Sequence, residues 1–332
     1  PEVRPGTVKL QVGYNGICGT DLHEYYSGPI FVPKSPHPLT GAQLPLTKGH
    51  EFSGTITAVG DGVTGWSEGD RVAVEPIYKC DRCGPCRAGN YNVCRQIGFH
   101  GLMSDGGMAE STVVPTSMLH RLPDNVSLEL GALVEPMSVA YHAATLGDVE
   151  SGDTAMVFGA GPIGIGLWFA LRGKGLEDVF VVEPSPTRRA AIEALGAHTL
   201  DPTVTDVPAF IAEHTEGEGA DAVFDAAGVT PAVATALGCI GSRKPMISVA
   251  IYEKPLETPL LNLVMNESRI QGSLCYTGAD FEAVIALMAD GHYDTTGWVT
   301  RIPVDDVVDE GFEALHAGTK MKVLVDPNGA NA

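Results

Sequence analysis

Basic residues are scarce in this sequence of 332 residues. Lysine and arginine together number 21 against 41 aspartates and glutamates, which gives a formal net charge of −20. A chain this acidic repels nucleic acid and anionic lipid, so we expect neither nucleic acid nor a membrane as a partner. Long apolar runs are missing as well, because glycines and a proline interrupt even the most hydrophobic segment, residues 157–173. The composition therefore predicts a soluble protein.

The sequence also lacks a signal-peptide pattern. Its seven cysteines are an odd number, and several have the spacing of metal ligands, which suits the reducing cytoplasm. The length is sufficient for two domains with buried cores and no disulfide bonds. The first residue is Pro1 rather than methionine, which leaves open that further residues precede it in the complete protein.

The pattern of predicted strands and helices changes once along the chain and then changes back. Short alternating segments separated by Gly, Pro and Asp predict a β-rich domain over residues 1–137. Strand and helix patterns then alternate over residues 138–277, which predicts a doubly wound parallel α/β sheet. Residues 278–332 contain a helix and a final strand that we expect to return to the first domain. A long proline-rich loop between His23 and His50 is a candidate functional loop.

A glycine-rich motif marks the start of the second pattern. G-x-G-x-x-G lies between an apolar strand and a helix and comprises Gly159, Gly161, Pro162, Ile163 and Gly164. Small residues there let the backbone approach a pyrophosphate at the positive end of the helix. Because glycine-rich turns are common, the motif alone is a weak signal for dinucleotide binding.

An acidic residue strengthens this interpretation. Glu183 ends the next strand, nineteen residues after Gly164. A carboxylate there binds ribose hydroxyls and repels a 2′-phosphate, so NAD is favoured over NADP. Arg188 is a further candidate cofactor contact. Arg188 and Arg189 complicate the preference for NAD, because an arginine near the ribose can accommodate the 2′-phosphate of NADP. The alternative is that both are solvated helix residues.

Four cysteines are concentrated in one short segment with the spacing C-x2-C-x2-C-x7-C, namely Cys80, Cys83, Cys86 and Cys94. Four thiolates complete a closed tetrahedral zinc shell and leave no position for water or substrate, so the pattern predicts a structural zinc. An iron–sulfur cluster is the main alternative, but the last interval and the lack of a following proline do not match the ferredoxin pattern.

A second metal site would have to be built from isolated residues. Cys18 follows a β segment in a glycine-flanked turn, His50 precedes another β segment, and Glu135 lies before Pro136 at an expected helix start. Each has an ordinary structural explanation: a core cysteine, a hydrogen-bonded histidine and a helix-start glutamate. The residues alone leave both interpretations open.

Taken in order, the motifs resemble a known family. G-I-C-G-T-D-x-H, G-H-E, the four-cysteine segment, V-E-P and G-x-G-x-x-G are similar to the zinc-dependent medium-chain dehydrogenase/reductase family over essentially the whole chain. That family has a GroES-like catalytic domain and a Rossmann NAD-binding domain. The loop containing GPIF and PHPLTG resembles the 2,3-butanediol dehydrogenases within the family, and relatives usually have a further β-hairpin before the segment that matches Pro1.

The resemblance implies a second, catalytic zinc held by Cys18, His50 and Glu135, with Glu51 as a nearby or exchangeable ligand and Asp21 orienting His50. It implies a proton relay through Thr20 and then His23, of which the alternatives are a turn threonine and a surface histidine. Residues flanking the nicotinamide would be Val249, Ala250 and Ser273.

The activity implied by the resemblance is NAD-linked oxidation of a vicinal diol to a hydroxyketone, 2,3-butanediol to acetoin, by reversible hydride transfer from a zinc-bound alkoxide. A sorbitol- or xylitol-type polyol dehydrogenase or a threonine dehydrogenase is the alternative within the family. A redox-inactive nucleotide- or zinc-binding protein that keeps the fold without catalysis is an alternative of another class. The expected assembly is a homodimer or homotetramer.

Overall fold

The computed structural model describes residues 1–252, 254–258 and 260–329. The last three residues of the segment expected to return to the first domain, 330–332, lie outside this range. The chain divides into two compact units. Unit 1 comprises residues 1–136, 277–291 and the segment from Trp298 onward, and unit 2 comprises residues 137–276 and 292–297. In the part of the chain that the structure describes, no helix is long and apolar enough to cross a membrane.

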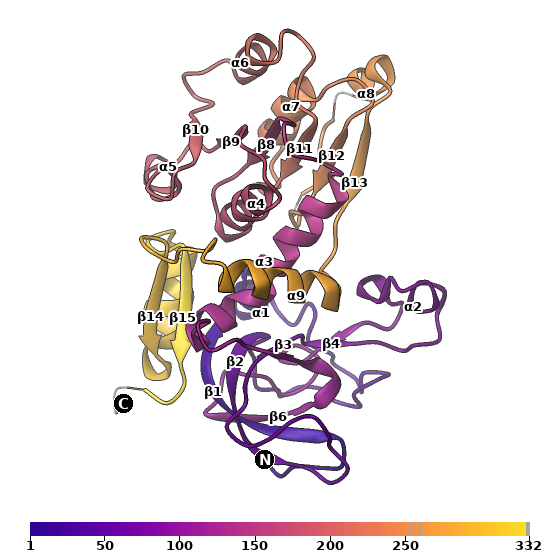
Figure 1. Ribbon diagram of the computed structural model, residues 1–332, viewed down its shortest axis with the longest axis vertical. Coiled ribbons are helices and arrows are strands. Elements are labelled where there is room, and N and C mark those ends of the chain that lie inside the picture. Colours follow the sequence, from indigo (N-terminus) through magenta and orange to yellow (C-terminus); the bar gives the residue numbers. More distant parts are fainter. Residues whose placement is uncertain (253, 259, 330–332) are drawn as a thin grey trace. The chain divides into compact units, whose positions relative to one another are not determined.

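Unit 1 is built on a seven-stranded sheet in the order β14-β15-β1-β2-β3-β7, with β6 also paired to β1 (Figure 1). Strands β14 and β15 come from the end of the chain, and β15 pairs with β1, from its beginning. The strands are β1 (Thr7–Gly16), β2 (Glu51–Val59), β3 (Arg71–Val74), β6 (Ser111–Pro115), β7 (Leu119–Arg121), β14 (Val299–Pro303) and β15 (Lys322–Asp326).

Alternation of side chains explains how this sheet buries a core. In β1, Val8, Leu10 and Val12 are fully buried, and Phe52 and Ile56 of the adjacent β2 belong to the same cluster. Successive strand residues point to opposite faces, so one face is apolar and the other accepts polar residues. The end of β1 departs from this rule, because Asn15 is buried and leads directly into the candidate metal site.

Shorter elements complete unit 1. The helices include α1, which follows β1, and α9, which belongs to the returning segment. The elements are α1 (Gly19–Ser27), β4 (Ile77–Tyr78), α2 (Gly84–Arg87), η1 (Tyr91–Val93), β5 (Gly98–Phe99), η2 (Thr116–Met118), α9 (Gly278–Ala289), η3 (Val304–Asp306), η4 (Val307–Glu313, a π-helix) and α10 (Ala314–His316).

Unit 2 contains a six-stranded, all-parallel sheet in the order β10-β9-β8-β11-β12-β13 (Figure 1). This is the doubly wound order, in which the chain reverses direction across the sheet between β8 and β11. The strands are β8 (Ala155–Phe158), β9 (Val179–Val182), β10 (His198–Leu200), β11 (Ala222–Asp225), β12 (Pro245–Ser248) and β13 (Arg269–Gly272). The predicted fold class is therefore confirmed.

Helices connect the strands of unit 2. Strands β8, β9 and β11 are buried along their whole length, as expected for a parallel sheet covered on both faces. The N-termini of α5 and α6 are capped by Ser185 and Asp206, whose side chains accept hydrogen bonds from backbone N–H groups. The helices are α4 (Pro162–Gly173), α5 (Pro186–Glu193), α6 (Val207–His214), α7 (Thr230–Cys239) and α8 (Leu260–Asn266).

Helix α3 (Leu128–Leu146) contains the boundary between the two units. We expected a helix start at Glu135 because glutamate followed by proline commonly opens a helix, but the helix begins at Leu128 and continues through Pro136. That expectation was wrong. Proline lacks the backbone N–H that a helix interior uses, and its presence there ordinarily costs about 3 kcal/mol. Glu135 is nonetheless buried, at 6% exposure.

Candidate functional site

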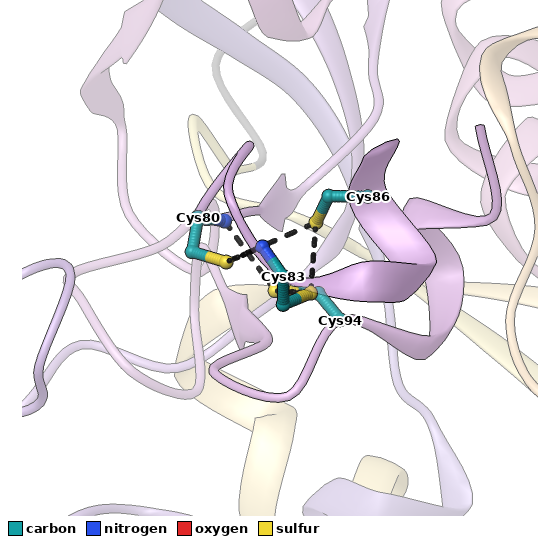
Figure 2. A group of neighbouring side chains, drawn as sticks. All are labelled: Cys80, Cys83, Cys86 and Cys94. Atoms are coloured by element: carbon teal, nitrogen blue, oxygen red, sulfur yellow. Dashed lines mark hydrogen bonds between the residues drawn. The ribbon is translucent and has the colours of Figure 1, made fainter. Parts of the chain in front are cut away.

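The four clustered cysteines converge in space. Cys80, Cys83, Cys86 and Cys94 lie around α2 and η1, and their sulfurs all lie within 4.8 Å of one another. Figure 2 shows the side chains turned toward a common centre. The Cys83 and Cys86 sulfurs are 3.4 Å apart, and those of Cys83 and Cys94 are 4.0 Å apart. This is the spacing of a tetrahedral tetrathiolate site.

Backbone amides support the charged form of these cysteines. The N–H of Cys83 donates to the Cys80 sulfur at 3.4 Å, and the N–H of Cys80 donates to the Cys94 sulfur at 3.3 Å. Backbone N–H groups, that of Arg95 most strongly, lower the pKa of Cys83 to about 6. Desolvation and the neighbouring sulfurs raise the pKa of Cys86 to about 12. Four sulfurs that converge in this way form a donor set that fits Zn²⁺.

A second group of donors gathers at the end of β1. Cys18, His50 and Glu51 also place one ligand atom each within 4.8 Å of the others. Cys18 precedes α1, and its backbone N–H donates to Asp21 Oδ2 at 3.0 Å. That hydrogen bond fixes the turn after β1 and directs the thiol toward the residues that open β2.

His50 is held between α1 and β2. Thr20 Oγ1 lies 3.4 Å from His50 Nε2, and Asp21 Oδ1 lies 3.9 Å from Nδ1. Asp21 is thus placed beside His50 as predicted, at the distance of an ion pair rather than of a hydrogen bond. Gly49 has a φ of +102°, and a Cβ there would overlap the Asn15 side chain, so only glycine fits before His50.

Glu51 is almost fully buried, at 1% exposure, and its carboxylate accepts a charge-assisted hydrogen bond from Lys322 Nζ. Lys322 is the first residue of β15 and is itself 2% exposed. The same Nζ donates to the carbonyl oxygen of Ile17 at 3.0 Å. We did not predict Lys322 as a site residue, because its distance along the chain gives no local signal.

Negative charge exceeds positive charge around His50. Burial acts to lower the pKa of His50, but Asp21, Cys18 and Glu135 outweigh it and raise that pKa to about 10. The same negative groups would favour a metal cation, which would displace that proton because a metal-bound histidine is neutral. Sulfur, nitrogen and carboxylate donors in one cluster fit Zn²⁺ with an open position.

Glu135 influences the site around Cys18 and His50 through its charge. It contributes to raising the pKa of both His50 and Lys322. Among the described residues, however, the compact three-donor group contains Glu51 and not Glu135. Glu51 is therefore the carboxylate that the geometry places among the donors, and Glu135 acts on the same groups through its charge.

The glycine-rich motif opens a separate cavity in unit 2. Gly159, Gly161, Glu183 and Arg188 all line a cavity of about 500 Å³ at the carboxyl ends of β8 and β9. Gly159 has a φ of +100°, which allows the tight turn after β8. Pro162, Ile163 and Gly164 form the first turn of α4, and a Cβ on Gly164 would overlap the Gly159 carbonyl.

The Glu183 carboxylate is fixed by two backbone N–H groups, those of Ala160 at 2.8 Å and Ser185 at 2.9 Å. Arg189 turns away to pair with Asp201 at 2.8 Å, so Arg188 is the arginine that lines the cavity.

The remaining predicted residues lie on defined elements. His23 is half-buried on α1, three residues after Thr20. Val249 and Ala250 follow β12, and their N–H groups donate to the Asp225 carbonyl oxygen at 3.0 and 3.2 Å. Ser273 follows β13, and its buried hydroxyl has no hydrogen-bond partner within the described ranges.

Two family matches cover most of the chain. Residues 4–124 match the alcohol dehydrogenase GroES-like domain, and residues 162–290 match the zinc-binding dehydrogenase domain. The chain therefore belongs to the zinc-binding medium-chain alcohol dehydrogenase family, as its motifs indicated, and it is an oxidoreductase.

Individual relatives are similar over nearly the whole chain. A (R,R)-butanediol dehydrogenase of Bacillus subtilis is 43% identical, with 99% of this chain and 94% of the relative covered. The crystal structure of the 2R,3R-butanediol dehydrogenase from Bacillus subtilis superimposes with a TM-score of 0.92 at 42% identity, covering 99% and 94% of the two chains. An Escherichia coli CFT073 alcohol dehydrogenase complexed with NADH gives a TM-score of 0.85 at 27% identity, with 98% of this chain and 93% of that chain covered.

Proposed function

We propose that this protein catalyses the reversible oxidation of a vicinal diol to a hydroxyketone, with 2,3-butanediol and acetoin as the substrate pair and NAD as the cofactor. The overall reaction converts diol and NAD⁺ into hydroxyketone, NADH and one proton. The observation that carries the proposal is the cluster of the half-buried Cys18 thiol with the buried His50 imidazole and Glu51 carboxylate, in a chain 43% identical to a (R,R)-butanediol dehydrogenase.

Two zinc ions per chain are part of the proposal. One would be held by Cys80, Cys83, Cys86 and Cys94 as a structural ion, and the other by Cys18, His50 and Glu135, with Glu51 beside it as an exchangeable ligand. The second ion supplies Lewis acidity, which lowers the pKa of an alcohol hydroxyl.

Thr20 and His23 would move the proton. Thr20 Oγ1 lies 3.4 Å from His50 Nε2, so its hydroxyl could accept the proton of a substrate alcohol while it releases its own proton to the next member of the relay. His23, farther along α1 and half-buried, would pass a proton to solvent, because an imidazole can both accept and donate a proton.

The two units would divide the work. The first, with its two metal sites, would be the catalytic domain, and the second would bind NAD, which accepts a hydride when bound. The cavity lined by Gly159, Gly161 and Glu183 would hold the pyrophosphate and the adenine ribose. Val249 and Ser273 would flank the nicotinamide.

An oligomer is also proposed. Four large side chains of α8, Leu260, Leu261, Val264 and Met265, are 59–73% exposed, and β13 is the edge strand of the parallel sheet. An edge strand beside exposed apolar residues is an unfavourable surface in water, which a second copy of the chain would cover in a homodimer or homotetramer.

A substrate panel tests the activity. NADH formation would be followed with (2R,3R)-butanediol, meso-butanediol, sorbitol, threonine and ethanol, each with NAD and with NADP. We expect a butanediol isomer to exceed sorbitol and threonine by about tenfold or more in kcat/KM. A higher kcat/KM for sorbitol or threonine would agree with the proposed dehydrogenase chemistry but would contradict butanediol as the substrate. No turnover with any alcohol, in protein that contains two zinc ions, would contradict the proposed activity.

A further inference from the structure

Lys322 joins two segments that carry metal donors. Its Nζ donates to the carbonyl oxygen of Ile17, the residue before Cys18, and to the carboxylate of Glu51, the residue after His50. The lysine side chain is 3% exposed and that of Glu51 is 1% exposed, so water cannot replace either partner. This ion pair is part of the buried framework on which the candidate metal site is built.

The Lys322–Glu51 ion pair matters for metal binding because of the position of Glu51. Its carboxylate lies within 4.8 Å of the Cys18 and His50 donor atoms and could itself bind a metal. Gly16 faces Glu51 across the β1–β2 pair, and a Cβ on Gly16 would overlap the Glu51 carboxylate. The carboxylate therefore lies over the Gly16 backbone, in contact with the ammonium of Lys322 and within 4.8 Å of the metal donors.

The other charges near the site do not duplicate this role. Lys48 Nζ lies 3.4 Å from Asp21 Oδ1, and both atoms are buried, but this lysine pairs with Asp21 rather than with Glu51. Among the described residues, Lys322 is the only cation that forms an ion pair with Glu51.

We propose that Lys322 is a positioning residue that holds the Glu51 carboxylate away from the catalytic metal, so that Glu51 remains exchangeable and the open coordination position is kept for the substrate. The inference rests on the proposed function, because it presumes a metal at Cys18 and His50. A buried carboxylate deprived of its ammonium would take the metal as its partner instead.

Lys322→Met removes the charge at similar side-chain length, and the double variant Lys322→Met/Glu51→Gln removes both charges. Lys320→Met is the matched control. Lys320 lies two residues before Lys322 in the chain, and it pairs with the exposed Glu310. Zinc release to a chelator would be timed with a zinc-sensitive dye. Cys18→Ser protein identifies which phase of release belongs to the catalytic site.

We expect Lys322→Met to release the catalytic-site zinc about 10- to 100-fold more slowly than the wild type and to lose turnover. The double variant should return to wild-type release within about threefold, and Lys320→Met should not differ from the wild type. Equal or faster release from Lys322→Met would overturn the proposal, since a merely structural lysine loosens the site when it is removed.

Thermal unfolding with and without zinc gives a second readout. Zinc should raise the Tm of Lys322→Met more than that of the wild type, because only in the variant does zinc neutralise Glu51. An equal or smaller rise, or failure of Lys322→Met to fold even with zinc, would overturn the proposal. If Cys18→Ser binds as much zinc as the wild type, the proposed catalytic metal site itself is wrong.

Discussion

Gly16 and Glu51 face each other as Cα partners in the antiparallel pair β1–β2, and the Glu51 carboxylate occupies the space where a Gly16 side chain would lie. Gly16 also pairs with Leu324 of β15, the strand that supplies Lys322. One glycine thus lets three strands converge around a buried carboxylate. The absence of a side chain at this position is a requirement of the site.

Gly16→Ala should therefore displace the Glu51 carboxylate. We expect a loss of about 1–3 kcal/mol in the free energy of unfolding from overpacking, together with reduced turnover. Urea denaturation and initial rates would measure both effects. Gly272→Ala is the control, because no atom lies within 4 Å of a Cβ at that position. Equal stability of the two variants would contradict the crowding at Gly16.

Removing a cysteine from each proposed metal site should separate the roles of the two proposed ions. Cys94→Ser should lower the zinc content from two ions per chain to one and lower the Tm, because a structural site contributes its metal-binding energy to folding. Cys18→Ser should also lose one zinc but reduce kcat/KM by more than about 100-fold. Elemental analysis with thermal unfolding distinguishes them, and unchanged zinc in either variant would count against that site.

His120 gives a pH dependence of stability. Its Nε2 lies 3.0 Å from Glu75 Oε2 and its Nδ1 lies 2.5 Å from Glu282 Oε1. Burial acts to lower the pKa of His120, but the two carboxylates outweigh it and raise that pKa. The stabilisation is therefore complete below the unfolded-state pKa of about 6.5 and is lost as the pH rises through the higher folded-state pKa.

We expect His120→Asn to lose about 1–3 kcal/mol of unfolding free energy at pH 6 and less at pH 9. Urea titrations at both pH values measure the difference. His292→Asn is the control, since His292 is exposed. If His120→Asn loses more unfolding free energy at pH 9 than at pH 6, the predicted direction of the pH dependence is wrong.

Glu183 should govern the choice of cofactor. Glu183→Gln removes the negative charge that excludes a 2′-phosphate, so we expect affinity for NAD to fall about tenfold and the preference over NADP to narrow. Fluorescence titration with NADH and NADPH measures the change. Glu177→Gln, at an exposed position before β9, is the control. Unchanged NADH affinity in Glu183→Gln would remove this carboxylate from the proposed ribose site.

The sequence was informative where neighbouring residues form a site together. The cysteine spacing predicted a group that does converge, and G-x-G-x-x-G with Glu183 predicted the lining of one cavity. The family resemblance was needed to join Cys18 to His50, because their proximity depends on the pairing of β1 with β2.

Two features could not be predicted in this way. Lys322 reaches Glu51 only because β15 pairs with β1, a contact between the two ends of the chain that no local pattern encodes. The continuation of α3 through Pro136 was also missed, since local propensity places proline at a helix start and the tertiary packing of this buried helix overrides it.

The position of Lys322 in the chain has a consequence for biosynthesis. The cysteine site lies within residues 80–94 and can close early, while the ribosome is still translating the rest of the protein. The other site has its thiol at residue 18 and its buried ammonium at residue 322, so a nascent chain carries an unbalanced Glu51 until almost all of it has been made. The two metal centres would therefore mature at different times, the stabilising one first and the one beside Glu51 last.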